Sequence, residues 1–290
     1  RPAAGTAFTS IHTQNILYNS NTPMSLQLID THSHIYDPQF DADRDEAVAR
    51  ARAAGVGRIL LPAVDAESYG AMFALARQYP ELCRPMMGLH PTSVNDNPRW
   101  REDLEQVARY LAAPPEGIRF CGVGEVGLDL YWSRDFLSQQ QQALRFQVEL
   151  SLQYGLPLVI HTRDAWDEMC ALLDAFRGRG VRGILHSFCG TADHYRALKA
   201  AGGFLFGIGG PVTYKKSSLP DTLREIPLSD LVLETDSPYL PPVPYRGKRN
   251  ESAYVGLVAC RLAEIYGTTP EEVAAVTTRN ARALFGERIS

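Results

Sequence analysis

The chain has 290 residues, of which 45% are hydrophobic and 21% are charged, and its formal net charge is −4. This length is enough for one large globular domain with a substantial core. A mildly acidic protein does not coat nucleic acid by bulk charge, so any polyanion would have to be bound by local basic groups.

Other features of the composition favour a soluble, cytoplasmic protein, which we expect to be a monomer. No apolar run approaches the roughly 20 residues that a membrane-spanning helix needs, and the chain opens without the pattern of a secretion signal. The five cysteines form no Cys-x-x-Cys pair, which is typical of reduced thiols in an intracellular compartment. Residues 1–25 are polar and aperiodic, so we expect a flexible or added extension ahead of a single domain at 26–290.

From residue 26 onwards, short β-rich runs alternate with longer segments of helical period. Helical stretches include 44–55, 67–80, 137–155, 191–203 and 275–286, and several end in glycine, as helix C-termini often do. Strands are predicted at 26–32, 57–64, 84–90, 119–127, 156–162, 182–188, 203–210 and 230–236.

Eight strand–helix units over about 250 residues predict an α/β fold, a single (β/α)8 TIM barrel of the metal-dependent hydrolase type. An open doubly wound sheet would need only about six such units. The first strand is not followed by a Gly-x-Gly-x-x-Gly motif, and no phosphate-binding P-loop occurs, which disfavours a nucleotide cofactor.

The first predicted strand ends in a pair of histidines, His32 and His34. Residues two apart on a strand face the same side, so both imidazoles could hold one divalent metal through a neutral nitrogen. Taken alone, the pair could equally be two solvated histidines.

Further polar residues able to bind a metal stand near the carboxyl ends of other predicted strands, which form the active face of a barrel. For each alone, a structural role competes: His90 could cap a strand before Pro91, and Glu125 or Asp129 could pair with an arginine. The residues in question are His90, Glu125, His161, His186 and Asp236.

Nitrogen and carboxylate ligands without cysteine suit Zn²⁺, Mn²⁺, Fe²⁺ or Mg²⁺. Because the set is larger than one open catalytic metal needs, we expect two ions roughly 3.5 to 4 Å apart with Glu125 as the bridge. A bridging carbamylated lysine is excluded, since Lys199, Lys215, Lys216 and Lys248 all lie in predicted helices or loops.

Seven motifs between Asp30 and Glu251 together resemble the TatD family of metal-dependent deoxyribonucleases, within the amidohydrolase-like barrels. The resemblance implies one metal held by His32, His34, Glu125 and Asp236, and a second held by Glu125, His161 and His186. The motifs are DTHSH, GLHP, GEVGLD, PLVIHTRD, HSFCG, ETDSPYL and YRGKRNE.

The resemblance also implies an activity: hydrolysis of phosphodiester bonds of DNA, as a 3′–5′ exodeoxyribonuclease acting on single-stranded or frayed 3′ ends. Two divalent ions, Mg²⁺, Mn²⁺ or Zn²⁺, would lower the pKa of an attacking water. Asp236 is expected to accept the proton, and Glu125 is the other candidate catalytic residue.

Basic side chains on the same face are candidates for binding the substrate phosphates, although such clusters are also common in solvated loops. Tyr214, Tyr239 and Tyr245 could stack on bases, or could simply fill surface or core. The candidate phosphate contacts are His90, Arg163, Lys215, Lys216, Arg246, Lys248 and Arg249.

Two other interpretations remain open from the sequence. The same metal centre could hydrolyse a carbonyl substrate such as an amide, a lactone or an aminoacyl ester. A barrel that binds metal without catalysis is the third possibility, and the intact set of ligand candidates argues against it.

Overall fold

The computed structural model describes residues 28–289. The predicted extension at 1–25, and the first two residues of the first predicted strand, lie outside the described residues. Within the described part of the chain, no helix is both long and apolar enough to cross a membrane.

Eight parallel strands within residues 28–289 form the barrel, and each overlaps one predicted run. They pair in the orders β1-β2-β3 and β4-β5-β6-β7-β8. Parallel bridges between Met87 and Val123 and between Ser33 and Ser237 join the two sheets at both seams. The strands are β1 (Leu28–Asp30), β2 (Val56–Leu61), β3 (Cys83–Pro85), β4 (Val123–Asp129), β5 (Leu158–Arg163), β6 (Arg182–Leu185), β7 (Gly203–Ile208) and β8 (Leu231–Leu233).

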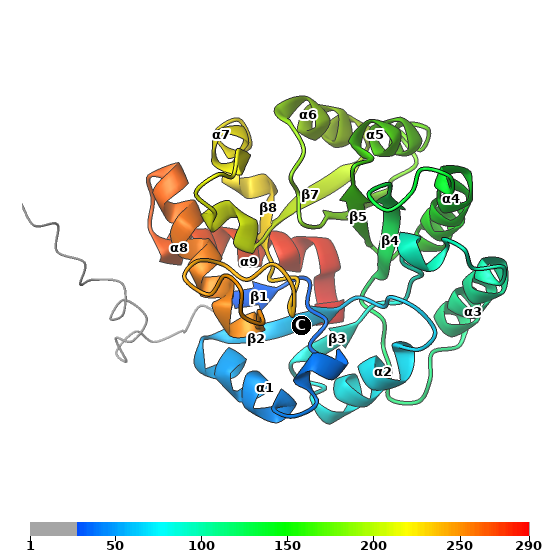
Figure 1. The fold of residues 1–290 in the computed structure, drawn as a ribbon, viewed down its shortest axis with the longest axis horizontal. Coiled ribbons are helices and arrows are strands. Elements are labelled where there is room, and N and C mark those ends of the chain that lie inside the picture. The colour runs from blue at the N-terminus through cyan, green and yellow to red at the C-terminus, as the bar shows by residue number, and fades with distance from the viewer. Residues whose placement is uncertain (1–27, 290) are drawn as a thin grey trace, which may run out of the picture.

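Helices surround the strands as an outer ring (Figure 1). Local sequence sets several of their ends: α4 stops at Gly155, whose φ of 60° is left-handed, and α6 begins with a capping box between Thr191 and His194. The helices are α1 (Arg44–Ala53), α2 (Tyr69–Gln78), α3 (Trp100–Ala112), α4 (Leu137–Tyr154), α5 (Trp166–Asp174), α6 (Ala192–Ala201), α7 (Leu219–Leu223), α8 (Val255–Tyr266) and α9 (Pro270–Phe285).

The apolar interior has two parts. The larger packs the outer faces of the strands against the helices. The smaller fills the barrel itself, where side chains of the strands meet Ala281, Phe285 and Ile289 from α9 and the turn after it. The last helix therefore closes one end of the barrel, and the open end is the one where the strands terminate.

Six of the eight predicted strands are too long at their carboxyl ends, all but those that match β4 and β5. Four of the six, β1, β3, β6 and β8, stop before ligand candidates, so His32, His34, His90, His186 and Asp236 follow the last residue of their strand. Asp236 has a φ of 58°, a left-handed conformation that aspartate tolerates better than most residues. Beyond the strands, the segments after β1 and β8 stay joined through Ser33 and Ser237, and the neighbouring side chains of His32, His34 and Asp236 turn into the mouth of the barrel.

Candidate metal centre

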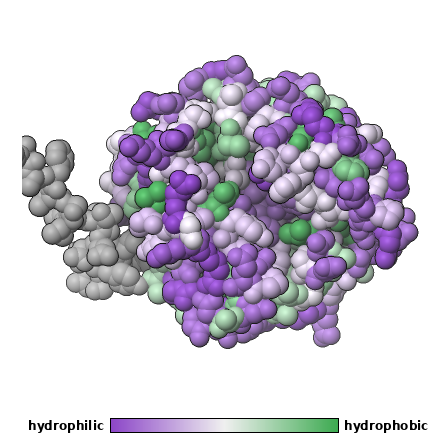
Figure 2. Space-filling model, in the orientation of Figure 1, coloured by the Kyte–Doolittle hydropathy of each residue, from purple (hydrophilic) through white to green (hydrophobic). Residues whose placement is uncertain are grey.

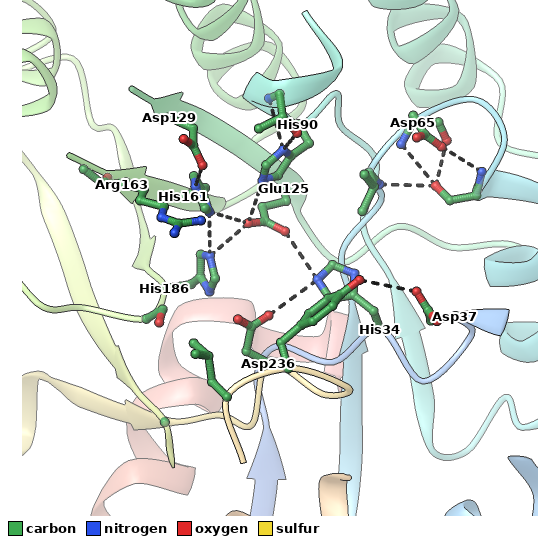
Figure 3. Close-up of a pocket in the computed structure, with 18 of the residues that line it drawn as sticks. His34, Asp37, Asp65, His90, Glu125, Asp129, His161, Arg163, His186 and Asp236 are labelled. Carbon is green, nitrogen blue, oxygen red and sulfur yellow. Dashed lines mark hydrogen bonds and ion pairs between the residues drawn. The ribbon is translucent and has the colours of Figure 1, made fainter. Parts of the chain in front are cut away.

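The other five predicted ligands lie around the carboxylate of Glu125. Figure 3 labels four of them, His34, His161, His186 and Asp236, while His32 lies on the same carboxylate. Glu125 is buried on β4, and its two carboxylate oxygens face two different groups of histidines. The structure thus brings together side chains that are up to about two hundred residues apart in the sequence.

The first group surrounds the Oε2 atom of Glu125. This oxygen lies 3.2 Å from Nε2 of His32 and 3.4 Å from Nε2 of His34, and these nitrogens are 3.1 Å apart. Oδ1 of Asp236 lies 3.6 Å from both nitrogens. Metal–ligand bonds of about 2.0–2.2 Å at tetrahedral angles separate ligand atoms by roughly 3.4 Å, so these four atoms fit one small divalent ion.

The second group surrounds the Oε1 atom of Glu125. Nδ1 of His161 lies 3.0 Å from this oxygen and Nε2 of His186 lies 2.9 Å from it, while the two nitrogens are 3.2 Å apart. Three ligand atoms leave room for water or substrate, as open catalytic sites do. Geometry suited to a metal is also met by three overlapping sets of side chains, so the mouth of the barrel is a candidate metal site. The two oxygens of Glu125 face different histidines within it. The three sets are His32 with His34 and Glu125, His90 with Glu125 and His161, and His32 with His186 and Glu234.

Two of the histidines, His34 and His161, use their remaining nitrogen on a fixed partner. The hydroxyl of Tyr36 donates to the carbonyl of Pro62, so it accepts from Nδ1 of His34 at 2.9 Å and leaves Nε2 of His34 free for a metal. Oδ2 of Asp129 lies 2.9 Å from Nε2 of His161. Such partners fix the tautomer and the ring orientation of metal-binding histidines.

His186 faces a carboxylate at a distance too long for a hydrogen bond. Oε1 of the fully buried Glu234 lies 3.6 Å from Nδ1 of His186, and it accepts a hydrogen bond from the backbone N–H of Ser187. The ring of His186 also stacks on that of His32, with centroids 3.8 Å apart. The imidazole is therefore held on two sides.

His90 differs from the other histidines because the nitrogen that faces Glu125 carries the proton. Its Nδ1 accepts a hydrogen bond from the backbone N–H of Thr92, so in the neutral ring the proton is on Nε2, which lies 3.3 Å from Oε1 of Glu125. A protonated nitrogen does not bind a metal but can donate to an oxygen. This arrangement fits the predicted substrate contact of His90 better than a ligand role.

Charges in the centre are arranged around one anion. Burial raises the pKa of Glu125, but His186, His90 and His32 more than offset this, and the net pKa is well below its usual range. Burial lowers the pKa of His186, yet the attraction of Glu125 and Glu234 brings it well above its usual value. The site is therefore built to keep Glu125 ionised among the imidazoles.

The segments that carry His32 and Asp236 are tied together by Asp30. Its buried carboxylate accepts hydrogen bonds from the backbone N–H of His32 at 3.3 Å and of Thr235 at 2.9 Å, and from the Thr235 hydroxyl at 2.7 Å. Burial raises the pKa of Asp30 to about 7, although hydrogen bonds from Ser252 and Thr235 oppose the shift. Asp30 thus links the ends of β1 and β8 beneath the first group of ligands.

A cavity of about 1070 Å³ opens above the metal candidates, and Figure 2 shows the hollow near the centre of this face with hydrophobic groups beside it. Of the seven predicted phosphate contacts, His90 and Arg163 line this cavity. Tyr239 is the one among the three predicted stacking tyrosines that lines it.

The other predicted cations lie further out. Lys215 and Lys216 are exposed after β7, and neither they nor Arg246, Lys248 and Arg249 line the cavity. Arg249 pairs with Asp43 at 2.7 Å and its guanidinium lies 4.1 Å from the ring centroid of Phe40. The guanidinium of Arg246 lies over Tyr214, and the amine of Lys248 lies near Tyr245. Their contact with phosphate stays a prediction.

The sequence did not show that Asp129 and Glu234 lie beside the histidines of the candidate metal centre. A signal was present for both, because Asp129 is four residues after Glu125 on one strand and Glu234 is two residues before Asp236. Residues at even spacing on a strand share a face. Which group each would meet depended on the neighbouring strands, and Asp129 contacts His161 rather than an arginine.

Comparison with known proteins gives a consistent picture. The family model described as TatD related DNase matches residues 29–286. A metal-dependent hydrolase of uncharacterised activity from Bacillus subtilis, YabD, is 36% identical over 259 residues, which cover 89% of this chain and 98% of YabD.

Two further relatives bear on the activity. The 3′-5′ ssDNA/RNA exonuclease TatD of Enterobacter lignolyticus is 35% identical over 267 residues, covering 89% of this chain and 99% of the exonuclease. The crystal structure of YjjV, a TatD homologue from Escherichia coli, superposes with a TM-score of 0.81 at 31% identity and covers 90% of this chain and 99% of YjjV.

Proposed function

The chain belongs to the TatD family of metal-dependent hydrolases, and from this premise we propose that it is an exonuclease that hydrolyses phosphodiester bonds of single-stranded DNA from the 3′ end. The observation that carries the proposal is the shared carboxylate. Oε2 of Glu125 faces one nitrogen–carboxylate group and Oε1 faces another, an arrangement suited to two divalent ions, Mg²⁺, Mn²⁺ or Zn²⁺.

When bound, such ions lower the pKa of an attacking water and offset charge on the phosphoryl oxygens. We assign His32, His34, Glu125 and Asp236 to one ion. The second ion is assigned to Glu125, His161 and His186. In this assignment Glu125 holds both groups at a fixed separation, and the tautomers set by Tyr36 and Asp129 present unprotonated nitrogens to the centre.

Asp236 is the residue to which we assign the proton of the water. Its carboxylate lies at the edge of the first ligand group, facing the cavity that would hold the substrate. The protonated Nε2 of His90 and the guanidinium of Arg163 line the same cavity and supply hydrogen-bond donors for the phosphate. The chain thus places a proton acceptor, hydrogen-bond donors for the phosphate and candidate metal ligands around one cavity.

The test is degradation of 3′-labelled and 5′-labelled single-stranded DNA by metal-stripped protein to which Mg²⁺, Mn²⁺ or Zn²⁺ is restored. We expect metal-dependent loss of the 3′ label first, and loss of activity in Glu125→Ala. Glu116→Ala, at an exposed glutamate outside the cavity, is the matched control. Intact DNA after incubation with metal-loaded protein would contradict the proposal and favour a carbonyl substrate.

A further inference from the structure

Large hydrophobic side chains that are exposed to solvent gather at the rim of the cavity. Within residues 28–289, five of six such residues lie on the loops that follow β4 and β8, and the sixth, Phe146, lies on α4. Exposed apolar groups that cluster beside a cavity are typical of a binding surface. The five are Tyr131, Trp132, Tyr239, Leu240 and Val243.

Trp132 is the most exposed of them, with 71% of its surface accessible, and it lines the cavity. Its ring meets that of Tyr131 edge to face, with centroids 4.8 Å apart. The guanidinium of Arg163 lies 3.6 Å from the centroid of the Tyr131 ring. Two aromatic rings and one cation therefore form a continuous surface, which we call the aromatic rim.

The aromatic rim is anchored to the candidate metal centre. Oδ1 of Asp129 accepts a hydrogen bond from the backbone N–H of Tyr131 at 3.1 Å, while Oδ2 of the same carboxylate holds His161. Arg163 follows His161 by two residues on β5 and lies beside it at the cavity (Figure 3). One carboxylate thus sets the position of a ligand and of the rim together.

We propose that the aromatic rim binds an unpaired nucleobase next to the scissile phosphodiester, with the base on the face of Trp132 and its phosphate at Arg163. This inference rests on the proposed function. Indole and phenol rings stack on any base, and a guanidinium binds phosphate, so the surface matches both halves of a nucleotide. A cavity of about 1070 Å³ has room for one or two nucleotides but not for a folded protein domain.

Stacking requires a base whose faces are free, so the rim gives the enzyme a preference for unpaired ends. It also predicts that the protein distinguishes a terminal nucleotide from an abasic residue with the same phosphates. A contact through Arg163 alone would not make that distinction, because phosphate contacts carry no information about the base.

The kinetic test uses the metal-loaded protein and six-nucleotide single-stranded DNA with either a normal or an abasic 3′ end. For the wild type we expect KM to be lower for the normal end by on the order of 5- to 100-fold, the range expected for loss of one stacked base. Trp132→Ala should abolish this ratio, and Trp132→Phe should keep part of it. Phe146→Ala, at the exposed aromatic residue away from the cavity, should keep the full ratio.

A binding readout separates this inference from the proposed function. A phosphorothioate version of the six-nucleotide DNA, which resists hydrolysis, should quench the emission of Trp132, taken as the difference between the wild type and Trp132→Phe. Cleavage without quenching, or with an unchanged ratio in Trp132→Ala, would overturn the inference alone. Quenching without cleavage of any DNA would support base binding by the aromatic rim and contradict the proposed nuclease activity.

Discussion

The imidazole of His161 lies between two carboxylates, with Nε2 2.9 Å from Oδ2 of Asp129 and Nδ1 3.0 Å from Oε1 of Glu125. Because an ionised carboxylate only accepts hydrogen bonds, Asp129 holds a proton on Nε2, and Nδ1 is then the nitrogen that would face a metal shared with Glu125. Burial lowers the pKa of His161, but these two partners raise it above its usual value. Asp129 therefore prepares a ligand without being one.

The first prediction concerns this supporting carboxylate. Asp129→Ala should weaken divalent-metal affinity by about 10- to 100-fold, because His161 loses the partner that fixes its tautomer and orientation. Competition with a fluorescent chelator measures the change. Asp135→Ala, at an exposed aspartate of the same loop, is the control, and equal affinities in the two variants would mean that Asp129 does not prepare His161 for the metal.

Much of the fold followed from the sequence, because strand and helix periods repeat eight times and each predicted run overlaps an observed strand. The family resemblance drawn from the motifs is confirmed as well. Residue types also indicated which side chains would meet: histidines and acids at predicted strand ends lie around Glu125, although His32, His34, His186 and Asp236 follow the last residue of their strands. Their role as metal ligands stays a prediction.

Partners distant in the sequence could not be predicted in the same way. Arg249 is a predicted phosphate contact, and nothing in the sequence indicates that it also pairs with Asp43, more than two hundred residues earlier. No local pattern announces such a contact, because it depends on how α1 packs beside the loop after β8. The same holds for the aromatic rim, because the sequence does not show that Arg163 lies over Tyr131 or that Trp132 lines the cavity.

The second prediction concerns metal and stability. A ligand that binds only the folded state stabilises it by about 2.7 kcal/mol when its free concentration is about 100 times Kd. Adding Mn²⁺ or Zn²⁺ to stripped protein should therefore raise Tm by roughly 5 to 10 °C. In Glu125→Ala the rise should disappear, whereas Glu116→Ala should keep it. An equal rise in both variants would show that the metal binds elsewhere.

The third prediction concerns Arg163, one of the two predicted phosphate contacts that line the cavity. Arg163→Ala should raise KM for single-stranded DNA. It should also make the slope of log KM against log salt concentration shallower by about 0.7, the value for one phosphate contact on a single strand. Arg134→Ala is matched to it, since Arg134 is an exposed arginine on the same face that pairs with Glu168 and does not line the cavity. A similar change in both variants would indicate general charge rather than a specific contact.

The fourth prediction concerns the space beside Glu234. A Cβ atom at Gly207 would overlap Oε2 of Glu234 and approach the backbone of His186 to 3.2 Å. Gly207→Ala should therefore destabilise the fold by about 1–3 kcal/mol and lower the metal-dependent activity. Urea unfolding measures the first effect and a DNA degradation assay the second.

A glycine with open surroundings provides the control for this substitution. Gly70 lies on α2 with no atom within 4 Å of its would-be Cβ, and alanine is the better helix former, so Gly70→Ala should be neutral or slightly stabilising. If Gly207→Ala behaved like Gly70→Ala, the close packing of Glu234 against β7 would not matter to the site.

The last prediction concerns acid stability and uses a pair away from the metal centre. Hydrogen bonds from Arg249 and then Arg50 lower the pKa of Asp43 from 3.8 to about 2. A group whose pKa is lower in the folded state stabilises the protein above its unfolded pKa, and that contribution is lost as the pH falls from about 4 to 2. Since about a third of the Asp43 side chain is exposed, solvent screening limits the contribution to below about 1 kcal/mol.

Asp43→Asn should accordingly reduce the free energy of unfolding at pH 7 and should leave it less dependent on pH between 4 and 2 than in the wild type. Urea unfolding across this range measures both effects. Asp41→Asn removes a neighbouring carboxylate that is 68% exposed and pairs only with Arg44 among the ion pairs of residues 28–289, so it should change the profile less. Identical profiles for wild type and Asp43→Asn would mean that the pairs of Asp43 with Arg249 and Arg50 do not stabilise the fold.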